Sequence, residues 1–430
     1  MILIIHKIVN LVTILIVSSL DPLVKPIPET VDIAIIGAGP QALTLVTHLL
    51  QKKASLRDRL VVFDRAGTWM AQWKQQFGAL EIPHLRSPAV HHPDPNPYAL
   101  RAFAANRPSE LFPPYDLPGT QLFQGFCEDV IERWRLGDGV IGASIRDIEP
   151  IQIEGRDRFR LHIQDHPPSL ARRVILATGG GPPRLPDWLA EIAPTYPPER
   201  LQHSSQIDLR TLHLGGEEIL IVGSGLTSGH LALGAIRRGA RVTLMARRQF
   251  YEKLFDADPG WLGPKYLKGF QAELDWGRRS QMIQEARNGG SVTPKILFKL
   301  RRLEREGKVQ FLENCQITRA TWNKGLWDID CDQPQGSLPS FDRLWLATGT
   351  DFDIRKHPLL QQVQRRYPLE TVGGLPQLDE HLRWGKSQLF LMGPGTALQV
   401  GPVARNIYGG KLASQRIVPA LTKSSLARVA

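Results

Sequence analysis

The chain has 430 residues, 42% apolar and 22% charged, a composition that excludes a disordered or fibrous protein and allows two packed domains. Its net charge is +11, but the basic residues are scattered along the chain, which gives little support to nucleic-acid binding. Cys127, Cys315 and Cys331 lie far apart and form no CxxC pair, which argues against a disulfide framework, a zinc knuckle and a dithiol redox centre and favours a reducing compartment.

The first 28 residues form an apolar segment that precedes the fold. In "MILIIHKIVNLVTILIVSSL", His6 and Lys7 leave an apolar run that is shorter than a membrane-spanning helix. The segment has a thin basic region and no good cleavage site, so secretion is disfavoured. Two interpretations stay open, a membrane-associating segment and an extension without function. We therefore predict a cytoplasmic protein that could attach peripherally to a membrane through its N-terminus.

A strand, turn and helix pattern begins at residue 31. The stretch "VDIAIIGAGPQALTLVTHLL" is an apolar run, a glycine turn and apolar residues at helical spacing. In such a turn the first glycine makes the tight bend, and the second lets the backbone approach a pyrophosphate at the helix N-terminus. A second apolar strand ends in an acid that could accept a ribose hydroxyl. The predicted FAD-binding residues here are Gly37, Gly39, Pro40, Ala42 and Asp64, the alternative being an ordinary turn.

The proline-rich loop "HLRSPAVHHPDPNPY" follows. His84, His91, His92 and Asp94 could ligate a metal in principle. Adjacent histidines of an extended chain point to different sides, however, and the prolines stiffen the loop instead of forming a helix with ligands at i and i+4. We therefore predict a stiff loop beside the active centre and no metal site.

The strand, turn and helix pattern recurs in "EEILIVGSGLTSGHLALGAIRRGARVTLMARR", with Gly223, Gly225 and Ser228 at the small positions. The second strand of this unit ends in Arg247 and Arg248 instead of an acid. Arginine pairs with a 2'-phosphate that a carboxylate would repel, so this unit is predicted to bind NADPH in preference to NADH. The alternative is that both arginines are solvated loop charges.

Two further apolar strands end in the turn Ala-Thr-Gly, at Gly179 and at Gly349. Such turns suit the points where a chain crosses between two nucleotide-binding lobes. The predicted fold class is α/β with two Rossmann-like dinucleotide-binding domains, a discontinuous FAD lobe and an inserted NADPH lobe. The predicted boundaries are 29–208 and 336–420 for the two parts of the FAD domain, and 209–335 for the NADPH domain, with a substrate-side insertion near 250–299.

Five features resemble the two-dinucleotide flavoprotein monooxygenases, that is the flavin-containing monooxygenases and, more closely, the lysine and ornithine N-hydroxylases. They are "GAGPQAL", Trp73 in "TWMAQW", "QHSSQID" with His203, "GSGLTS" and "DRLWLATGT". The resemblance covers about residues 30 to 418. Ile207 and Thr350 depart from the usual aromatic residue and tyrosine, and the residues that grip an amino-acid substrate have no convincing counterparts.

The resemblance implies an FAD-dependent, NADPH-using monooxygenase. NADPH would reduce FAD, oxygen would add to the reduced flavin as a C4a-(hydro)peroxide, and a small nucleophilic substrate, such as an amine undergoing N-hydroxylation, would take the distal oxygen. It also places Arg86 and Ser87 beside the flavin as candidate catalytic residues, where Arg86 would stabilise reduced flavin unless it pairs with a surface acid. The remaining predicted cofactor-binding residues are Trp73, Leu85, Gly179, His203, Gly349, Gly395, Leu398 and Gln399.

Two other functions stay open. A flavin oxidoreductase would pass electrons from NAD(P)H to an acceptor such as a quinone without inserting oxygen. A non-catalytic FAD-binding regulatory protein would keep the fold without a productive substrate pocket. The expected partners are a small-molecule substrate and molecular oxygen, with no nucleic acid; the sequence does not indicate an oligomeric state.

Overall fold

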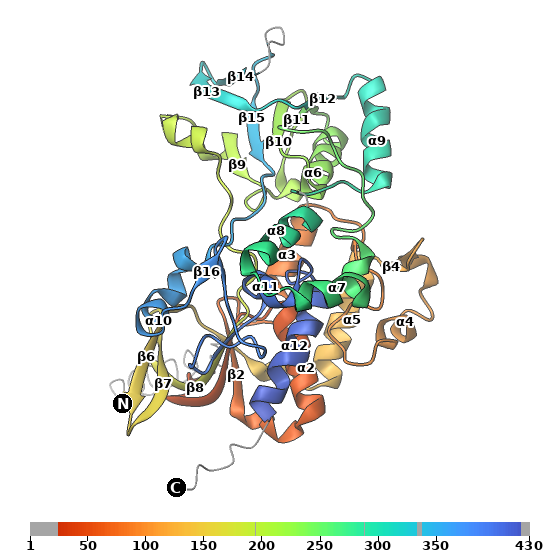
Figure 1. Cartoon of the computed structure of the whole chain (residues 1–430). Helices are drawn as coiled ribbons and strands as arrows, with labels where there is room; N and C mark the ends of the chain where they lie inside the picture. The colour runs from red at the N-terminus through yellow and green to blue at the C-terminus, as the bar shows by residue number, and fades with distance from the viewer. Residues whose placement is uncertain (1–24, 194, 288, 333–337, 423–430) are drawn as a thin grey trace, which may run out of the picture.

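The structure is a computed structural model that describes residues 25–193, 195–287, 289–332 and 338–422. Its two larger sheets lie toward opposite ends of the molecule in Figure 1. The predicted apolar N-terminal segment lies outside the described residues, except for its last four positions. Within the described ranges, no helix is both long and apolar enough to cross a membrane. Attachment to a membrane through the N-terminus stays a prediction.

The first sheet has seven strands in the order β5-β2-β1-β8-β7-β6, with β18 also paired to β8. Its parallel strands are β1 (Thr30–Ile36), β2 (Leu60–Asp64), β5 (Val140–Gly142), β8 (Ser169–Leu176) and β18 (Leu389–Leu391). An antiparallel extension is formed by β6 (Ile145–Ile153) and β7 (Arg156–Ile163). Ile36 is level with Phe63 and with Leu176, so β1, β2 and β8 end at one edge of the sheet.

Helices cover this first sheet. The helix α2 (Pro40–Lys52) directly follows β1 and buries leucine and valine side chains at the predicted helical spacing. The C-terminal helix α12 (Ile407–Thr422) packs along α2. Further helices of this lobe are α3 (Ala71–Ala79), α4 (Ala99–Phe103), α5 (Thr120–Arg133), α10 (Gln361–Arg366) and α11 (Ala397–Val400). Short strand pairs are β3 (Leu111–Phe112) with β4 (Leu117–Pro118) and β16 (Thr371–Val372) with β17 (Leu375–Pro376).

The second sheet has five parallel strands in the order β12-β11-β10-β15-β9. They are β9 (Leu201–His203), β10 (Glu218–Val222), β11 (Arg241–Ala246), β12 (Val309–Glu313) and β15 (Arg343–Leu346). The helix α6 (Leu226–Arg237) follows β10 and packs against α9 (Pro294–Arg305). A hairpin of β13 (Ile317–Asn323) and β14 (Leu326–Cys331) adjoins this sheet.

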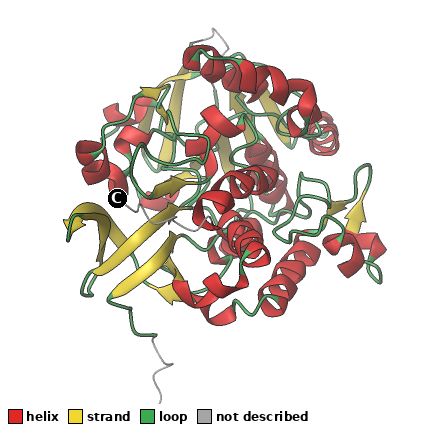
Figure 2. Cartoon of the chain, turned by 60° about the horizontal axis from the view of Figure 1, so that its bottom comes forward, coloured by secondary structure: helices red, strands yellow, loops and turns green. Residues whose placement is uncertain are grey.

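The predicted fold class is confirmed, because each lobe combines a sheet containing parallel strands with helices, and helices and strands are interspersed across the molecule (Figure 2). The second sheet also takes in strands from outside the range 209–335 predicted for the NADPH domain. Both β9 and β15 pair into the second sheet, although they lie outside 209–335. Their place is decided by pairing with strands far away in the sequence, which no local pattern of residues reveals.

The predicted insertion near 250–299 divides between the two lobes. Two helices, α7 (Pro264–Ala272) and α8 (Trp276–Arg287), contribute Phe270 and Ile283 to the core of the first lobe. In contrast, Ile296 of α9 belongs to the core of the second lobe. The insertion therefore bridges the two lobes (Figure 1).

Candidate functional site

The first glycine turn joins β1 to α2. Gly37 has φ +102°, and a Cβ atom there would lie 2.5 Å from the carbonyl oxygen of Ala177, so only glycine fits. Gly39 is the N-cap of α2, and no atom of the described residues lies within 4 Å of the Cβ position that it lacks. The turn is thus closed toward the sheet and open in front of the helix, where unpaired N–H groups can bind a phosphate.

Three predicted residues complete the first turn. Pro40 is the first residue of α2, where its missing N–H costs no hydrogen bond, and Ala42 is fully buried. Asp64 ends β2, and its Oδ2 accepts a hydrogen bond from the N–H of Ala38 at 3.0 Å. Its Oδ1 accepts another from the N–H of Ala66 at 2.9 Å. These bonds hold a partly exposed carboxylate at the rim of the turn, and its remaining lone pairs can accept a ribose hydroxyl.

The second glycine turn, between β10 and α6, repeats this geometry. Gly223 has φ +139°, and a Cβ atom there would lie 2.4 Å from the carbonyl oxygen of Ala347. Gly225 is the N-cap of α6, and again the described residues place no atom within 4 Å of its absent Cβ. Ser228 is buried, and its hydroxyl donates to the carbonyl of Gly225 at 2.6 Å. This second turn can therefore bind a second pyrophosphate.

The chain crosses between the lobes directly after the two Ala-Thr-Gly turns. Gly179 and Gly349 have φ +88° and +79°, values that glycine adopts without strain. The N–H of Arg184 donates to the carbonyl of Gly349 at 2.9 Å, and the N–H of Asp351 donates to that of Pro182 at 2.9 Å. The two crossings thus run side by side as one connection.

His203 fastens this connection to the second sheet. Its Nε2 lies 3.0 Å from the carbonyl oxygen of Gly349, and its Nδ1 lies 2.8 Å from the hydroxyl of Ser205. Burial lowers the pKa of His203, so the ring is neutral near pH 7, with Nε2–H as the donor to Gly349. His203 was predicted to bind a cofactor, and the contacts that it makes here hold the crossover turn.

A cavity of about 1170 Å³ lies between the lobes. The second glycine turn lines it together with Arg247 and Arg248, and so do Pro394, Ala397 and Pro402 of the C-terminal segment. Residues of the two crossings also line the cavity. A single space therefore reaches from the second turn to the first lobe, as hydride transfer between two cofactors requires.

Arg247 and Arg248 follow β11, as predicted, and both line the cavity. Arg247 is exposed. Arg248 donates from Nη2 to the carbonyl of Gly290 at 2.8 Å, and its guanidinium lies 5.2 Å from the ring centroid of Tyr251. Two cationic side chains thus stand beside the turn at the position where an NADP 2'-phosphate is expected.

Arg86 also lines the cavity, but its donors face protein carbonyls. Its Nε donates to the carbonyl of Leu254 at 2.8 Å, and its Nη2 donates to that of Lys253 at 2.6 Å and to Ser291 Oγ at 2.8 Å. Asp256 Oδ1 lies 3.9 Å from Nη1. These bonds fasten the proline-rich loop to the insertion, so the contact of Arg86 with flavin stays a prediction.

The proline-rich loop is held by its own polar side chains. Ser87 Oγ lies 2.7 Å from His91 Nδ1, and the His91 ring packs on Tyr408 of α12 with centroids 4.8 Å apart. Burial lowers the pKa of His91 to about 4. Asp94 Oδ2 accepts a hydrogen bond from Arg133 at 3.0 Å. No group of three metal-ligating side chains comes together within the described part of the chain.

Trp73 and Leu85 contribute to packing in the first lobe. Trp73 stacks on Phe77 within α3, with ring centroids 4.2 Å apart. Leu85 is buried in the core, and its N–H donates to the carbonyl of Pro118 at 2.9 Å. Their side chains support the loop, and a direct contact of either with FAD stays a prediction.

The predicted C-terminal residues lie on and before α11. A Cβ atom on Gly395 would stand 3.0 Å from Phe352 Cζ, so glycine permits close packing at the cavity rim. Leu398 is fully buried. Gln399 donates from Nε2 to the carbonyl of Leu378 at 2.6 Å. The three residues thus shape the first lobe beside the cavity, and their binding to FAD stays a prediction.

Two arginines at the first-lobe end of the cavity were not predicted from the sequence. Arg287 ends α8 and pairs with Asp256 at 2.6 Å. Arg405 precedes α12, and within the described residues its one recorded polar contact is Thr350 Oγ1 at 3.4 Å. Surrounding protein, and then the charge of Arg287, lower the pKa of Arg405 to about 10, so it stays charged at pH 7. An isolated arginine carries no sequence signal for such a position.

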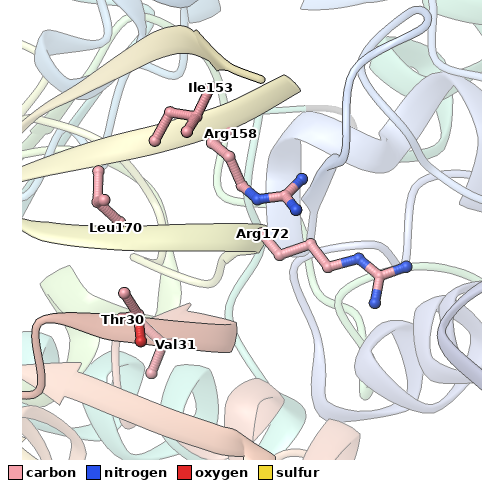
Figure 3. A pocket seen from close by; sticks show the side chains of 6 residues that line it. All are labelled: Thr30, Val31, Ile153, Arg158, Leu170 and Arg172. Atoms are coloured by element: carbon pink, nitrogen blue, oxygen red, sulfur yellow. The ribbon is translucent and has the colours of Figure 1, made fainter. Parts of the chain in front are cut away.

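A smaller hollow of about 250 Å³ lies over the first sheet (Figure 3). Thr30 and Val31 of β1 line it, at the opposite end of that strand from the glycine turn. Arg172 points out from β8 and lies 3.4 Å from Asp32 Oδ1. With mostly apolar walls and no paired acid and base, this hollow is not a candidate active site.

Two open glycine turns, one beside an acid and the other beside two arginines and the interlobe cavity, define a flavoprotein oxidoreductase with one site for FAD and one for NADP. Residues 34–181 match a family model described as FAD-NAD(P)-binding. Residues 135–352, about half of the chain, match the model of the L-lysine 6-monooxygenase/L-ornithine 5-monooxygenase family. The protein therefore belongs to the lysine/ornithine monooxygenase family, which confirms the resemblance and both predicted cofactors.

Individual relatives are distant in sequence and close in fold. L-lysine N6-monooxygenase of Escherichia coli is 25% identical over 221 residues, which are 47% of this chain and 50% of the relative. The match thus spans half the length of that curated relative. An ornithine hydroxylase from Pseudomonas aeruginosa superposes with a TM-score of 0.70 at 17% identity, covering 91% of this chain and 98% of the other. A cadaverine monooxygenase from Erwinia amylovora gives a TM-score of 0.72 at 16% identity, covering 91% and 94%.

Proposed function

We propose that the protein is an NADPH-dependent FAD monooxygenase that N-hydroxylates an amine. The observation that carries this proposal is the single cavity that joins the NADP turn to the first lobe. The relatives named above are called ornithine hydroxylase, lysine monooxygenase and cadaverine monooxygenase, so the amine group is the feature that their names share.

FAD fits the first turn because Gly39 leaves the front of α2 open and Asp64 keeps acceptor capacity beside it. In this proposal the α2 N-terminus holds the pyrophosphate and Asp64 accepts a ribose hydroxyl. When bound, FAD supplies the hydride acceptor for NADPH and activates oxygen. The residues of the chain bind and orient the cofactors and keep water out.

NADPH fits the second turn because this turn also leaves the helix N-terminus open and has suitable side chains beside it. Gly225 opens the N-terminus of α6 to the pyrophosphate, while Arg247 and Arg248 pair with the 2'-phosphate. Arg86 and His203 have a positioning role. Arg86 holds the insertion and His203 holds the crossover, and both of these segments line the cavity. Apolar side chains of Ile283, Phe352 and Leu375 line the space and limit the entry of water.

The charges at the first-lobe end of the cavity favour an amine that also carries an acidic group. Arg405 and Arg287 face this end, and Asp256 is already paired with Arg287. A diamine would bring a second positive charge toward Arg405, whereas a carboxylate would neutralise it. We therefore assign Arg405 as the anchor of the substrate's acidic group, with the amine placed toward the cofactors.

A matched pair of substrates tests this proposal. Purified protein with FAD and NADPH is given lysine or cadaverine, which differ by one carboxylate, and the hydroxylamine product is measured by mass spectrometry. We expect product from the acid and much less from the diamine. Hydroxylation of the diamine alone would overturn the role of Arg405, and rapid NADPH-driven quinone reduction without any hydroxylamine would favour the acceptor oxidoreductase instead.

Variants in the cavity wall sharpen this test. Arg405→Met should raise the KM for an acidic amine by about tenfold or more, the loss of one charge-assisted hydrogen bond. Arg184→Met is the matched control, because Arg184 lines the same cavity but lies 3.7 Å from the carboxylate of Asp351. Equal effects of both variants would contradict a specific anchor at Arg405.

A further inference from the structure

Two cysteines that are separated in the sequence come together beside the NADP end of the cavity. Cys331 is the last residue of β14 and pairs across the hairpin with Ile317. Cys315 lies two residues before β13 and belongs to a buried cluster of side chains, and Cys331 packs against the same cluster. The neighbouring Cys331 thiol contributes to raising the pKa of the Cys315 thiol.

The backbone around the pair is firmly held. The N–H of Gln316 donates to Asp332 Oδ1 at 2.9 Å, and the N–H of Asp332 donates to the carbonyl of Gln316 at 3.1 Å. Cys315 donates its N–H to the carbonyl of Ala246 at 2.9 Å, directly before Arg247. Cys315 thus links the hairpin to the end of β11, which carries the predicted 2'-phosphate site.

The two thiols differ in their access to solvent. Cys315 is buried at 1% exposure, and burial together with the neighbouring thiol raises its pKa to about 12. Cys331 is partly exposed. An oxidant would therefore reach Cys331 first, and Cys315 is placed to react second. No third metal ligand joins them within the described ranges, which leaves thiol chemistry as the property of this pair.

We propose that Cys315 and Cys331 form a reversible disulfide when the protein meets hydrogen peroxide, and that this bond weakens NADP binding. The Cys331 thiol is oxidised by one peroxide molecule to a sulfenic acid, with release of water. The Cys315 sulfur then attacks the Cys331 sulfur, an S–S bond forms, the S–OH bond breaks, and a second water leaves. Two thiols and one peroxide thus yield one disulfide and two waters, and a dithiol reductant reverses the reaction.

The effect on NADP binding follows from the position of the pair. Both Cys315 and Gln316 line the cavity, next to the strand end that carries Arg247 and Arg248. Joining the two sulfurs moves Cys315 and, through its hydrogen bond to Ala246, the neighbouring arginines. A coupling of this kind typically changes affinity by about fivefold or more. This inference concerns NADP binding and does not depend on which substrate is oxygenated.

Peptide mapping tests the bond itself. The full chain, loaded with FAD, is treated with hydrogen peroxide, its remaining thiols are alkylated, and its peptides are analysed by mass spectrometry. We expect a peptide that joins residues 315 and 331 and is two hydrogens lighter than its reduced parts. A bond that involves Cys127, or oxidation of Cys331 beyond sulfenic acid without a crosslink, would overturn the proposal.

Calorimetric titration with NADP⁺ tests the consequence. Peroxide should weaken NADP⁺ binding about fivefold in the wild-type protein, and a dithiol reductant should restore it. Cys331→Ser and Cys315→Ser should each abolish the response to peroxide, whereas Cys127→Ser, which removes a thiol buried within α5 of the other lobe, should retain it. Weakening that persists in Cys331→Ser, or unchanged affinity in a crosslinked protein, would contradict the assigned role.

Discussion

The two glycine turns differ mainly in what stands beside them. In both, the first glycine packs against the alanine carbonyl of an Ala-Thr-Gly strand end, at 2.5 Å from the absent Cβ of Gly37 and 2.4 Å from that of Gly223. In both, the second glycine caps a helix whose front is open. An acid ends β2, whereas two arginines follow β11. One backbone design is thus used twice, and the adjoining side chains decide which dinucleotide each turn binds.

The largest effect expected from this comparison is the loss of one cofactor at a time. Gly39→Val and Gly225→Val each place a side chain in the space before a helix N-terminus, where no described atom outside the neighbouring residues lies within 4 Å of the added Cβ. Both variants should fold. Gly39→Val should be purified without flavin, and Gly225→Val should retain flavin but fail to bind NADPH, as absorbance and calorimetry can measure. Flavin in both variants would show that the first turn is not the FAD site.

The next effect is on stability. Gly37→Ala and Gly223→Ala each force a Cβ atom onto a backbone carbonyl and place alanine at positive φ. We expect a loss of about 3 kcal/mol or more in the free energy of unfolding for each, measured by chemical denaturation. Gly155→Ala is a suitable control, because its φ is also positive, +70°, but no described atom lies within 4 Å of the added Cβ. Similar losses of stability in all three variants would show that the contact between the added Cβ and the backbone carbonyl is not the cause.

A smaller effect separates the two nucleotides at the second turn. The double variant Arg247→Ala with Arg248→Ala should weaken NADPH binding about ten- to a hundredfold, since charge-assisted hydrogen bonds to the 2'-phosphate are lost. NADH binding should change by less than about twofold, because NADH has no such phosphate. The rate of flavin reduction by each nucleotide, measured over a range of nucleotide concentrations, gives the difference. Equal losses for both nucleotides would mean that the arginines contact a part of the cofactor that NADPH and NADH share.

The smallest effect concerns pH and applies to both lobes. Burial lowers the pKa of His91 in the first lobe and of His230 in the second to about 4, from 6.5. The unfolded chain binds a proton first, so each histidine's contribution is complete above about pH 6.5 and is lost as pH falls toward 4. At pH 5 the loss is about 2 kcal/mol for each. His91→Gln should flatten the fall in melting temperature between pH 7 and pH 5, and an unchanged slope would contradict a buried neutral ring.

The turns could be predicted from sequence because each is encoded within about thirty consecutive residues, as a strand, a glycine pair and a helix. The contacts of Arg86 could not, because its partners, the carbonyls of Lys253 to Phe255, lie far along the chain. The same reason explains why β9 and β15 were left outside the NADPH domain.

The most direct test of the whole account follows the oxygen atom. Flavin-loaded protein is reduced with NADPH without oxygen and then mixed with ¹⁸O₂ and an acidic amine that the protein accepts. We predict one ¹⁸O atom in the hydroxylamine for each NADPH consumed, with the label depending on an intact second turn. If the flavin is reoxidised but the amine carries no ¹⁸O, the protein is not a monooxygenase for that amine. Transfer of the electrons to an added quinone in place of oxygen would then favour the acceptor oxidoreductase.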